Sequence, residues 1–204
     1  MTTIGIAVHP SLPIHSLKEL IDYAKASPGK LSYGSAGIGS FNNLTGELLK
    51  SLAGTADIVH VPYKGAGPAL TDAVSGHIPV VLPNATGQVI ALHRSGKLRI
   101  VAVTSPARLV ALPDIPTAVE AGLPGMIAQN FTGLFAPAGT PPAIVGQISR
   151  ATRAAMAEPE FRELLVKSGF EPQVDFDPRK TRAFVQEEIA RWAPVIRAIG
   201  LKLD

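Results

Sequence analysis

The sequence predicts an α/β protein with a mostly parallel sheet that is flanked by helices. Short apolar segments alternate with helix-like segments five times before residue 106. Most of these apolar segments are continuous rather than alternating apolar and polar, which is typical of strands covered on both faces. With 46% hydrophobic and 17% charged residues, the chain can bury a core and does not resemble a disordered protein.

The first half of the chain reads as strand–helix pairs. A capping-box pattern, Ser16 followed by Glu19, predicts the first helix, and Pro28-Gly29 ends it. Gly96 lies just past the end of the last helix of this half. We expect strands at 4–8, 30–35, 57–63, 78–84 and 97–105, with helices at 17–27, 42–53, 67–76 and 86–96.

After Ser105 the pattern changes. Four prolines between 106 and 124 predict a rigid loop with one short helix, capped by Thr117 with Glu120. Segment 130–142 reads as a strand followed by a proline- and glycine-marked corner, and helices are expected at 141–157, 159–168 and 178–199. We expect Asp177 to cap the last helix, Pro194 to bend or interrupt it, and Trp192 to be a core residue.

The stretch LSYGSAGIGSFNNLTGELLKSL, residues 31–52, places a glycine turn (residues 34–40) between a strand and a helix. Free N–H groups at such a turn and the dipole of the following helix favour an anion. Neither known phosphate cradle fits, because no Lys follows Gly39 and Asn42 stands where a dinucleotide fingerprint needs a third glycine. A purely structural turn, with Ser40 as a helix cap, therefore stays open as the alternative.

Two further turns follow strands in the same way. Tyr63-Lys64-Gly65-Ala66-Gly67 precedes a helix, and Asn84 follows the next strand. Lys64 is either an anion partner or a solvated surface lysine, and Tyr63 either lines a cleft or packs. Because carboxyl ends of parallel strands share one edge of a sheet, where ligands bind in open α/β sheets, we expect the three turns to lie together.

The sequence shows no clear motif for catalysis or for metal binding. The five histidines lack metal-ligand spacing, paired carboxylates are absent from the three turns, and no Gly-x-Ser-x-Gly motif occurs, so we expect no catalysis, no cofactor and no metal. The net charge of +3 is dispersed, which argues against nucleic-acid binding. No secretion signal is read at the start, so a native start at Met1 would predict a cytoplasmic protein.

Five segments carry a family resemblance, in this order: LSYGSAGIGSFNNLTGELLKSLAG, DIVHVPYKGAGPALTDAVSG, GKLRIVAVTS, LPDIPTAVEAGLPG and GLFAPAGTPPAIV. Together they resemble the Bug-type solute-binding receptors of tripartite tricarboxylate transporters, from about Val8 to the C-terminus. The resemblance implies a two-lobed, type II periplasmic-binding-protein-like fold. It also implies a periplasmic location, a small di- or tricarboxylate or related organic anion as ligand, and delivery to the transporter's membrane components.

The resemblance also implies ligand-binding residues: Ser35, Gly37, Gly39, Ser40, Asn43, Tyr63, Lys64, Gly65, Ala66, Asn84 and Phe131. This chain departs from the family pattern in three places. Asn43 stands where the family often has His, Pro83 where an acid is frequent, and Phe131 where Trp is typical. The missing acid favours simple dicarboxylates over amino acids as ligands.

The front of the family pattern is not found, so the resemblance implies a truncated receptor. We expect one complete lobe at 10–129, with 1–9 and 130–204 as a remnant of the first lobe. One lobe alone predicts weak binding, and unpaired sheet edges predict self-association. Two alternatives stay open: an interaction protein or non-functional relic that binds no ligand, and, less favoured, an enzyme that binds an anion at the glycine turn.

Overall fold

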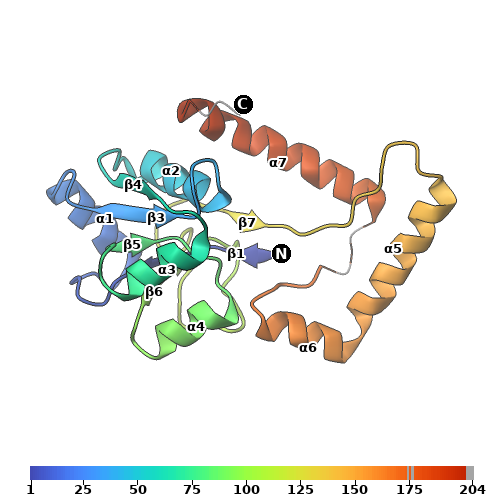
Figure 1. Cartoon of the computed structure of the whole chain (residues 1–204), viewed down its shortest axis with the longest axis horizontal. Coiled ribbons are helices and arrows are strands. Elements are labelled where there is room, and N and C mark those ends of the chain that lie inside the picture. The colour runs from blue at the N-terminus through green and yellow to red at the C-terminus, as the bar shows by residue number, and fades with distance from the viewer. Residues whose placement is uncertain (174, 176, 201–204) are drawn as a thin grey trace.

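The computed structural model describes residues 1–173, 175 and 177–200. Residues 1–130 form a body around a five-stranded sheet, and residues 131–200 form an arm of three helices beside it (Figure 1). The N-terminus lies where the body meets the arm (Figure 1). The α/β architecture expected from the sequence, a sheet flanked by helices, is confirmed.

The sheet has the order β4-β3-β5-β2-β6. Its strands are β2 (Gly5–Val8), β3 (Ser32–Ser35), β4 (Val59–Pro62), β5 (Val80–Val81) and β6 (Arg99–Val103). β3 is parallel to β4 and β5, whereas β2 is antiparallel to both β5 and β6. The sheet is therefore mixed, with the N-terminal strand inserted in the opposite direction.

Helices cover both faces of this sheet. α1 (Leu17–Ala26) and α2 (Phe41–Ala53) pack on the face to which Ile6 and Val8 point. α3 (Ala66–Val74) and α4 (Gly87–Arg94) pack on the opposite face, where Ala7 points. β2 and most of β6 are buried on both faces, which explains their uninterrupted apolar sequence.

The loop after β6 keeps its predicted capping box without a helix. Thr117 N–H donates to the Glu120 carboxylate at 2.8 Å, and Glu120 N–H donates to Thr117 Oγ1 at 3.0 Å. The residues that follow form turns only, so the short helix expected here is wrong. Gly122, Pro124 and Gly125 follow within one turn, and they prevent the segment from continuing as a helix.

The arm begins after β7 (Gln129–Asn130), which pairs antiparallel with β1 (Thr2–Thr3). The strand expected within 130–142 ends at Asn130, because the following residues have no partner strand among the described residues. The arm's helices are α5 (Pro142–Ala157), α6 (Pro159–Lys167) and α7 (Pro178–Ala198). Asp177 caps α7 as predicted, and the helix continues through Pro194 rather than being interrupted. Within the described part of the chain, no helix is long and apolar enough to cross a membrane.

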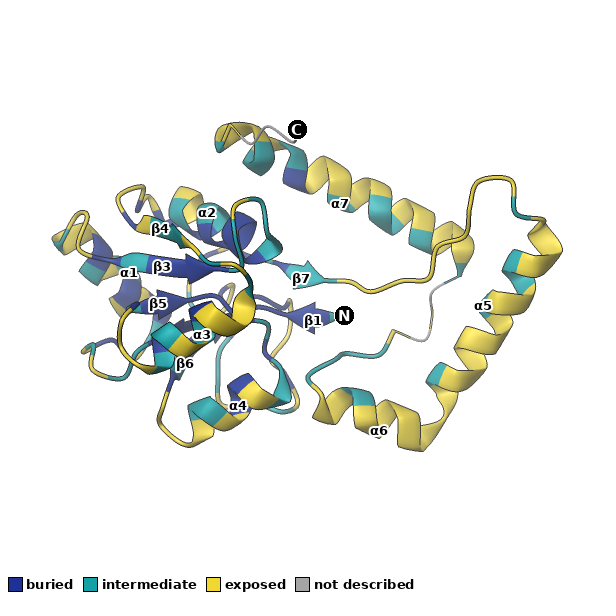
Figure 2. Ribbon diagram, in the orientation of Figure 1, coloured by how far each residue is buried: buried dark blue, intermediate teal, exposed yellow. Residues whose placement is uncertain are grey.

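The arm touches the body at few points. Glu171 N–H donates to Met1 O at 2.7 Å, and a Cβ on Gly169 would lie 2.4 Å from Ala85 O. Trp192, the one buried residue among the described residues of 131–200, packs against α2. Figure 2 shows the arm's helices almost entirely in the exposed and intermediate colours. The boundary expected at residue 9 is not a break in the fold, because β2 lies between β5 and β6. Residues 5–8 therefore belong to the body's sheet rather than to a remnant beside it.

Candidate functional site

The glycine turn (residues 34–40) joins β3 to α2 and lies close to the segment that follows β4. A Cβ on Gly34 would lie 3.2 Å from the Tyr63 ring, and one on Gly37 would lie 3.2 Å from Tyr63 O. Gly37 and Gly39 have φ values of 128° and 74°, which residues other than glycine rarely adopt. The glycines therefore allow a tight turn pressed against the neighbouring one.

The N–H groups of the glycine turn fall into two sets. Gly37 N–H donates to Ser35 Oγ at 3.1 Å and Gly39 N–H to Asn43 Oδ1 at 3.0 Å. In the described part of the chain, no acceptor is found for the N–H groups of Ala36, Ile38, Phe41 and Asn42. The donors left for a ligand are thus the N–H groups between the glycines and in the first turn of α2.

The predicted polar side chains hold the turn itself. Ser35 Oγ donates to Gly37 O at 3.1 Å, and Ser40 Oγ donates to the same oxygen at 2.7 Å. Ser40 Oγ also accepts from Asn43 N–H, which makes it the cap of α2. Ser35 and Asn43 are buried. Ser35, Ser40 and Asn43 therefore shape the backbone, and the contribution of these residues to ligand binding stays a prediction.

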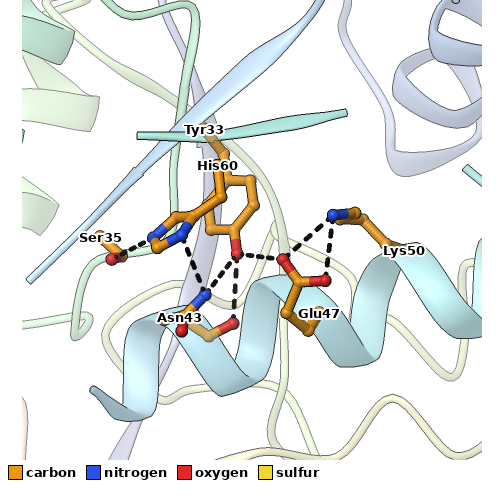
Figure 3. Close-up of polar contacts among 6 residues, drawn as sticks. All are labelled: Tyr33, Ser35, Asn43, Glu47, Lys50 and His60. Carbon is orange, nitrogen blue, oxygen red and sulfur yellow. Dashed lines mark hydrogen bonds and ion pairs between the residues drawn. The ribbon is translucent and has the colours of Figure 1, made fainter. Parts of the chain in front are cut away.

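A partly buried polar network lies behind the turn (Figure 3). Asn43 Nδ2 donates to Tyr33 Oη at 2.8 Å, and Tyr33 Oη donates to Glu47 Oε1 at 2.7 Å. Lys50 pairs with Glu47 at 3.0 Å, and His60 Nε2 lies 2.7 Å from Ser35 Oγ. The network joins α2, β3 and β4 at the base of the glycine turn.

Burial perturbs two groups of this network. It raises the pKa of Tyr33 far above its usual range, and the hydrogen bond to Glu47 adds to the shift. Burial also lowers the pKa of His60, which Glu47 opposes and Lys50 reinforces. Tyr33 is therefore a neutral hydrogen-bonding group at physiological pH, and the site favours neutral His60.

The second turn (residues 63–67) lies beside the glycine turn, as predicted. Tyr63 N–H donates to Ser35 O at 3.0 Å, and its hydroxyl donates to Asp72 at 2.9 Å. Lys64 is exposed and free of ion pairs within the described part of the chain. Gly65, with φ of 122°, precedes α3, and no acceptor is found among the described residues for the N–H of Ala66. This turn offers a cation and a second helix N-terminus next to the first.

The third turn (residues 82–87) is not open in the same way. Asn84 Oδ1 accepts from Asn130 Nδ2 at 2.8 Å, and the chain at Gly169 lies against Ala85 and Thr86. Phe131 packs edge-to-face with Phe184 at 5.3 Å. The structure thus places two of the three predicted turns side by side, each with N–H groups that can donate to a ligand. The arm covers the third turn.

Sequence reasoning missed the residues behind the turn. Tyr33, Glu47 and His60 were not predicted to take part, and the free N–H groups expected at the turn were not assigned to individual residues. Two polar signals were present: a His in an otherwise apolar strand, and a Tyr in the neighbouring strand. Among the described residues, no group of three His, Asp or Glu side chains gathers to hold a metal ion.

The chain is similar to a known family of receptors. The family model of the tripartite tricarboxylate transporter family receptor, TctC, matches residues 1–201. Protein BugT of Bordetella pertussis is 35% identical over 198 residues, which cover 97% of this chain and 60% of BugT. The chain therefore spans about 60% of the length of this curated relative.

Solved structures agree with the sequence match. R. palustris protein Rpa4515 with adipate aligns with a TM-score of 0.86 and 34% identity, covering 98% of this chain and 66% of that one. MatC from Rhodopseudomonas palustris with bound malate aligns with a TM-score of 0.82 and 32% identity, covering 96% of this chain and 66% of that one. The chain belongs to the receptor family of tripartite tricarboxylate transporters, as the sequence resemblance implied.

Proposed function

We propose that this chain binds a small carboxylate at the edge formed by the glycine turn and the second turn. The observation that carries the proposal is the set of unpaired N–H groups at Ala36 and Ile38, beside those at the start of α2. A carboxylate has two oxygens that accept several such bonds, and the N-termini of α2 and α3 both favour negative charge. Lys64 adds an exposed cation at the rim.

The relatives support the class of ligand. Structural neighbours at 34% and 32% identity are described with adipate and with malate, which are both dicarboxylates. Receptors of this family work with membrane components of tripartite transporters. We therefore propose delivery of a di- or tricarboxylate to such a transporter, in the periplasm, as the role of the receptor to which this lobe corresponds.

Binding by this chain alone is expected to be weak. Charge-assisted hydrogen bonds contribute about 1.5–3 kcal/mol each. Two or three of them, less the entropy of association, correspond to roughly millimolar affinity. A second lobe would exclude water from the site and strengthen each contact.

The test is an NMR titration of the protein with adipate and with malate. We expect the amide signals of Ala36 and Ile38 to shift with roughly millimolar midpoints. Gly37→Ala should weaken binding at least tenfold, because a Cβ at φ of 128° and 3.2 Å from Tyr63 O displaces the turn. Gly29→Ala is the matched control, since Gly29 also has positive φ, 71°, but lies before β3 with open space around it. Flat amide shifts at tens of millimolar ligand would exclude the proposal.

Self-association is a second candidate role, favoured by the surface of the arm. Leu134, Phe135 and Leu164 are exposed by 74%, 69% and 59%, and α5 and α6 bury none of their residues. Size-exclusion chromatography with and without dicarboxylate separates the two roles. A stable dimer with a flat ligand titration would favour an interaction protein over a receptor lobe.

A further inference from the structure

We propose that His60 is a positioning residue that sets the glycine turn for ligand binding, and that it does so only as the neutral imidazole that donates from Nε2. The inference rests on the proposed function for its ligand, but the geometry behind the turn carries it. His60 lies on β4, and its ring stacks on Tyr33 with 4.9 Å between centroids. Its two nitrogens face Ser35 and Asn43, two of the three side chains that hold the glycine turn (Figure 3).

The direction of each hydrogen bond follows from Asn43. Its Oδ1 accepts from Gly39 N–H at 3.0 Å, so the other end of the amide is the NH₂ group. This NH₂ donates to Tyr33 Oη at 2.8 Å and faces His60 Nδ1 at 3.4 Å. Because an NH₂ group only donates, Nδ1 must act as the acceptor and carry no proton.

The neutral ring then carries its proton on Nε2, which lies 2.7 Å from Ser35 Oγ. Ser35 Oγ accepts from this N–H and from Gly37 N–H at 3.1 Å, and it donates its own proton to Gly37 O. The one donor and both acceptor positions of the Ser35 hydroxyl are therefore occupied. His60 is thereby connected through Ser35 to Gly37 and through Asn43 to Gly39, the two glycines on either side of the free Ile38 N–H.

Protonation would oppose this arrangement. A proton on Nδ1 places two donors, the imidazolium and the Asn43 NH₂, against each other. β3 and α2 are the elements packed against β4, and their titratable groups facing the ring are Tyr33, Glu47 and Lys50. Glu47 is already paired with Lys50 and accepts from Tyr33, so it does not offer the imidazolium a direct partner. Burial favours the neutral ring as well, since it lowers the pKa of His60 below its usual value.

The first experiment uses the protein without ligand. We expect the amide signals of Gly37 and Gly39 to titrate with the same midpoint as the His60 ring signals, below the ordinary histidine pKa of about 6.5. Ser35→Ala should uncouple Gly37 from the ring while His60 still titrates. Flat Gly37 and Gly39 signals through the His60 titration would overturn the proposal. This outcome is independent of whether any carboxylate binds.

The second experiment follows adipate affinity with pH. Wild-type affinity should fall by about tenfold as His60 becomes protonated, the contribution of about one hydrogen bond. His60→Gln, which offers a donor and an acceptor and does not titrate, should lose the part of the pH dependence caused by His60 and keep only the part caused by protonation of adipate itself. His93→Gln is the matched control, because His93 is half-buried and its pKa is also lowered by burial, but it lies on α4. A His60→Gln profile identical to that of wild type, or tighter wild-type binding at low pH, would refute the role of His60. No adipate binding at any pH would refute the proposed function instead.

Discussion

The body and the arm are both rich in amphipathic helices, yet they differ in what those helices cover. In the body, α1 buries Leu17 and Leu20 against the sheet, leaving Leu20 1% exposed. In the arm, α5 and α6 bury no residue at all, and Leu164 on α6 is 59% exposed. An apolar stripe at helical spacing thus predicts a helix in both regions, but it does not indicate whether a partner is present.

The largest expected difference between the regions is in the effect of truncating a leucine. Leu20→Ala should lower the free energy of unfolding by about 3 kcal/mol, because it leaves a cavity between α1 and the sheet. Leu164→Ala on α6 should change it by no more than about 0.5 kcal/mol, because water already reaches this side chain. Urea unfolding followed by circular dichroism measures both. Equal losses from the two variants would show that an unrecognised partner, such as a second copy, covers α6 in solution.

Two glycine-to-alanine substitutions, one in the body and one in the arm, should change the free energy of unfolding in opposite directions. A Cβ on Gly46 in α2 would lie 2.3 Å from the buried ring of Tyr33, so Gly46→Ala should cost about 2 kcal/mol by overpacking. Gly146 in α5 is near only the flexible end of Arg150, at 3.4 Å, so Gly146→Ala should stabilise the helix by up to about 1 kcal/mol. Thermal unfolding and helix content by circular dichroism report the two effects. A stabilised Gly46→Ala variant would mean that α2 does not pack on Tyr33 as tightly as described.

Most elements of the body could be predicted from sequence because their signals are local. The continuous apolar runs of β2 and β6 and the Ser16 cap of α1 all depend on neighbouring residues. The antiparallel direction of β2 could not be predicted this way, since it depends on which strands flank residues 5–8. The strand expected beyond Asn130 failed for the same reason. Phe131, Leu134 and Phe135 have strand-like character, but in the part of the chain that the structure describes no strand lies beside them.

The site was predicted at the level of turns rather than of atoms. Gly37 and Gly39 correctly marked a tight turn between a strand and a helix. Which N–H groups stay free depends on where Ser35 and Asn43 point, and these side chains are fixed by His60 and Tyr33, on β4 and β3. The sequence also could not predict that the arm covers the third turn, because Gly169, which lies against Ala85, is distant from it in sequence.

The smallest effect on the body is expected at the contact that joins the two regions. Trp192 packs edge-to-face on Phe41 with 5.0 Å between ring centroids, and its indole N–H donates to Glu188 at 3.1 Å. Trp192→Ala should lower the body's free energy of unfolding by no more than about 1 kcal/mol, because the sheet and α1 keep their own core. The protection of amides in the second half of α7 against hydrogen exchange should fall by at least about tenfold, because the helix loses its main apolar anchor.

Trp192→Phe separates packing from hydrogen bonding at this contact. The phenyl ring keeps an aromatic face toward Phe41 and loses only the donor to Glu188, so most of the protection in α7 should remain. If Trp192→Ala instead costs as much as Leu20→Ala, and α7 and the body lose protection together, the arm and the body unfold as one cooperative unit. The few anchors at Met1, Gly169 and Trp192 would then couple the arm to the core far more strongly than their buried area predicts, and the contrast between the two regions would be one of exposure rather than of stability.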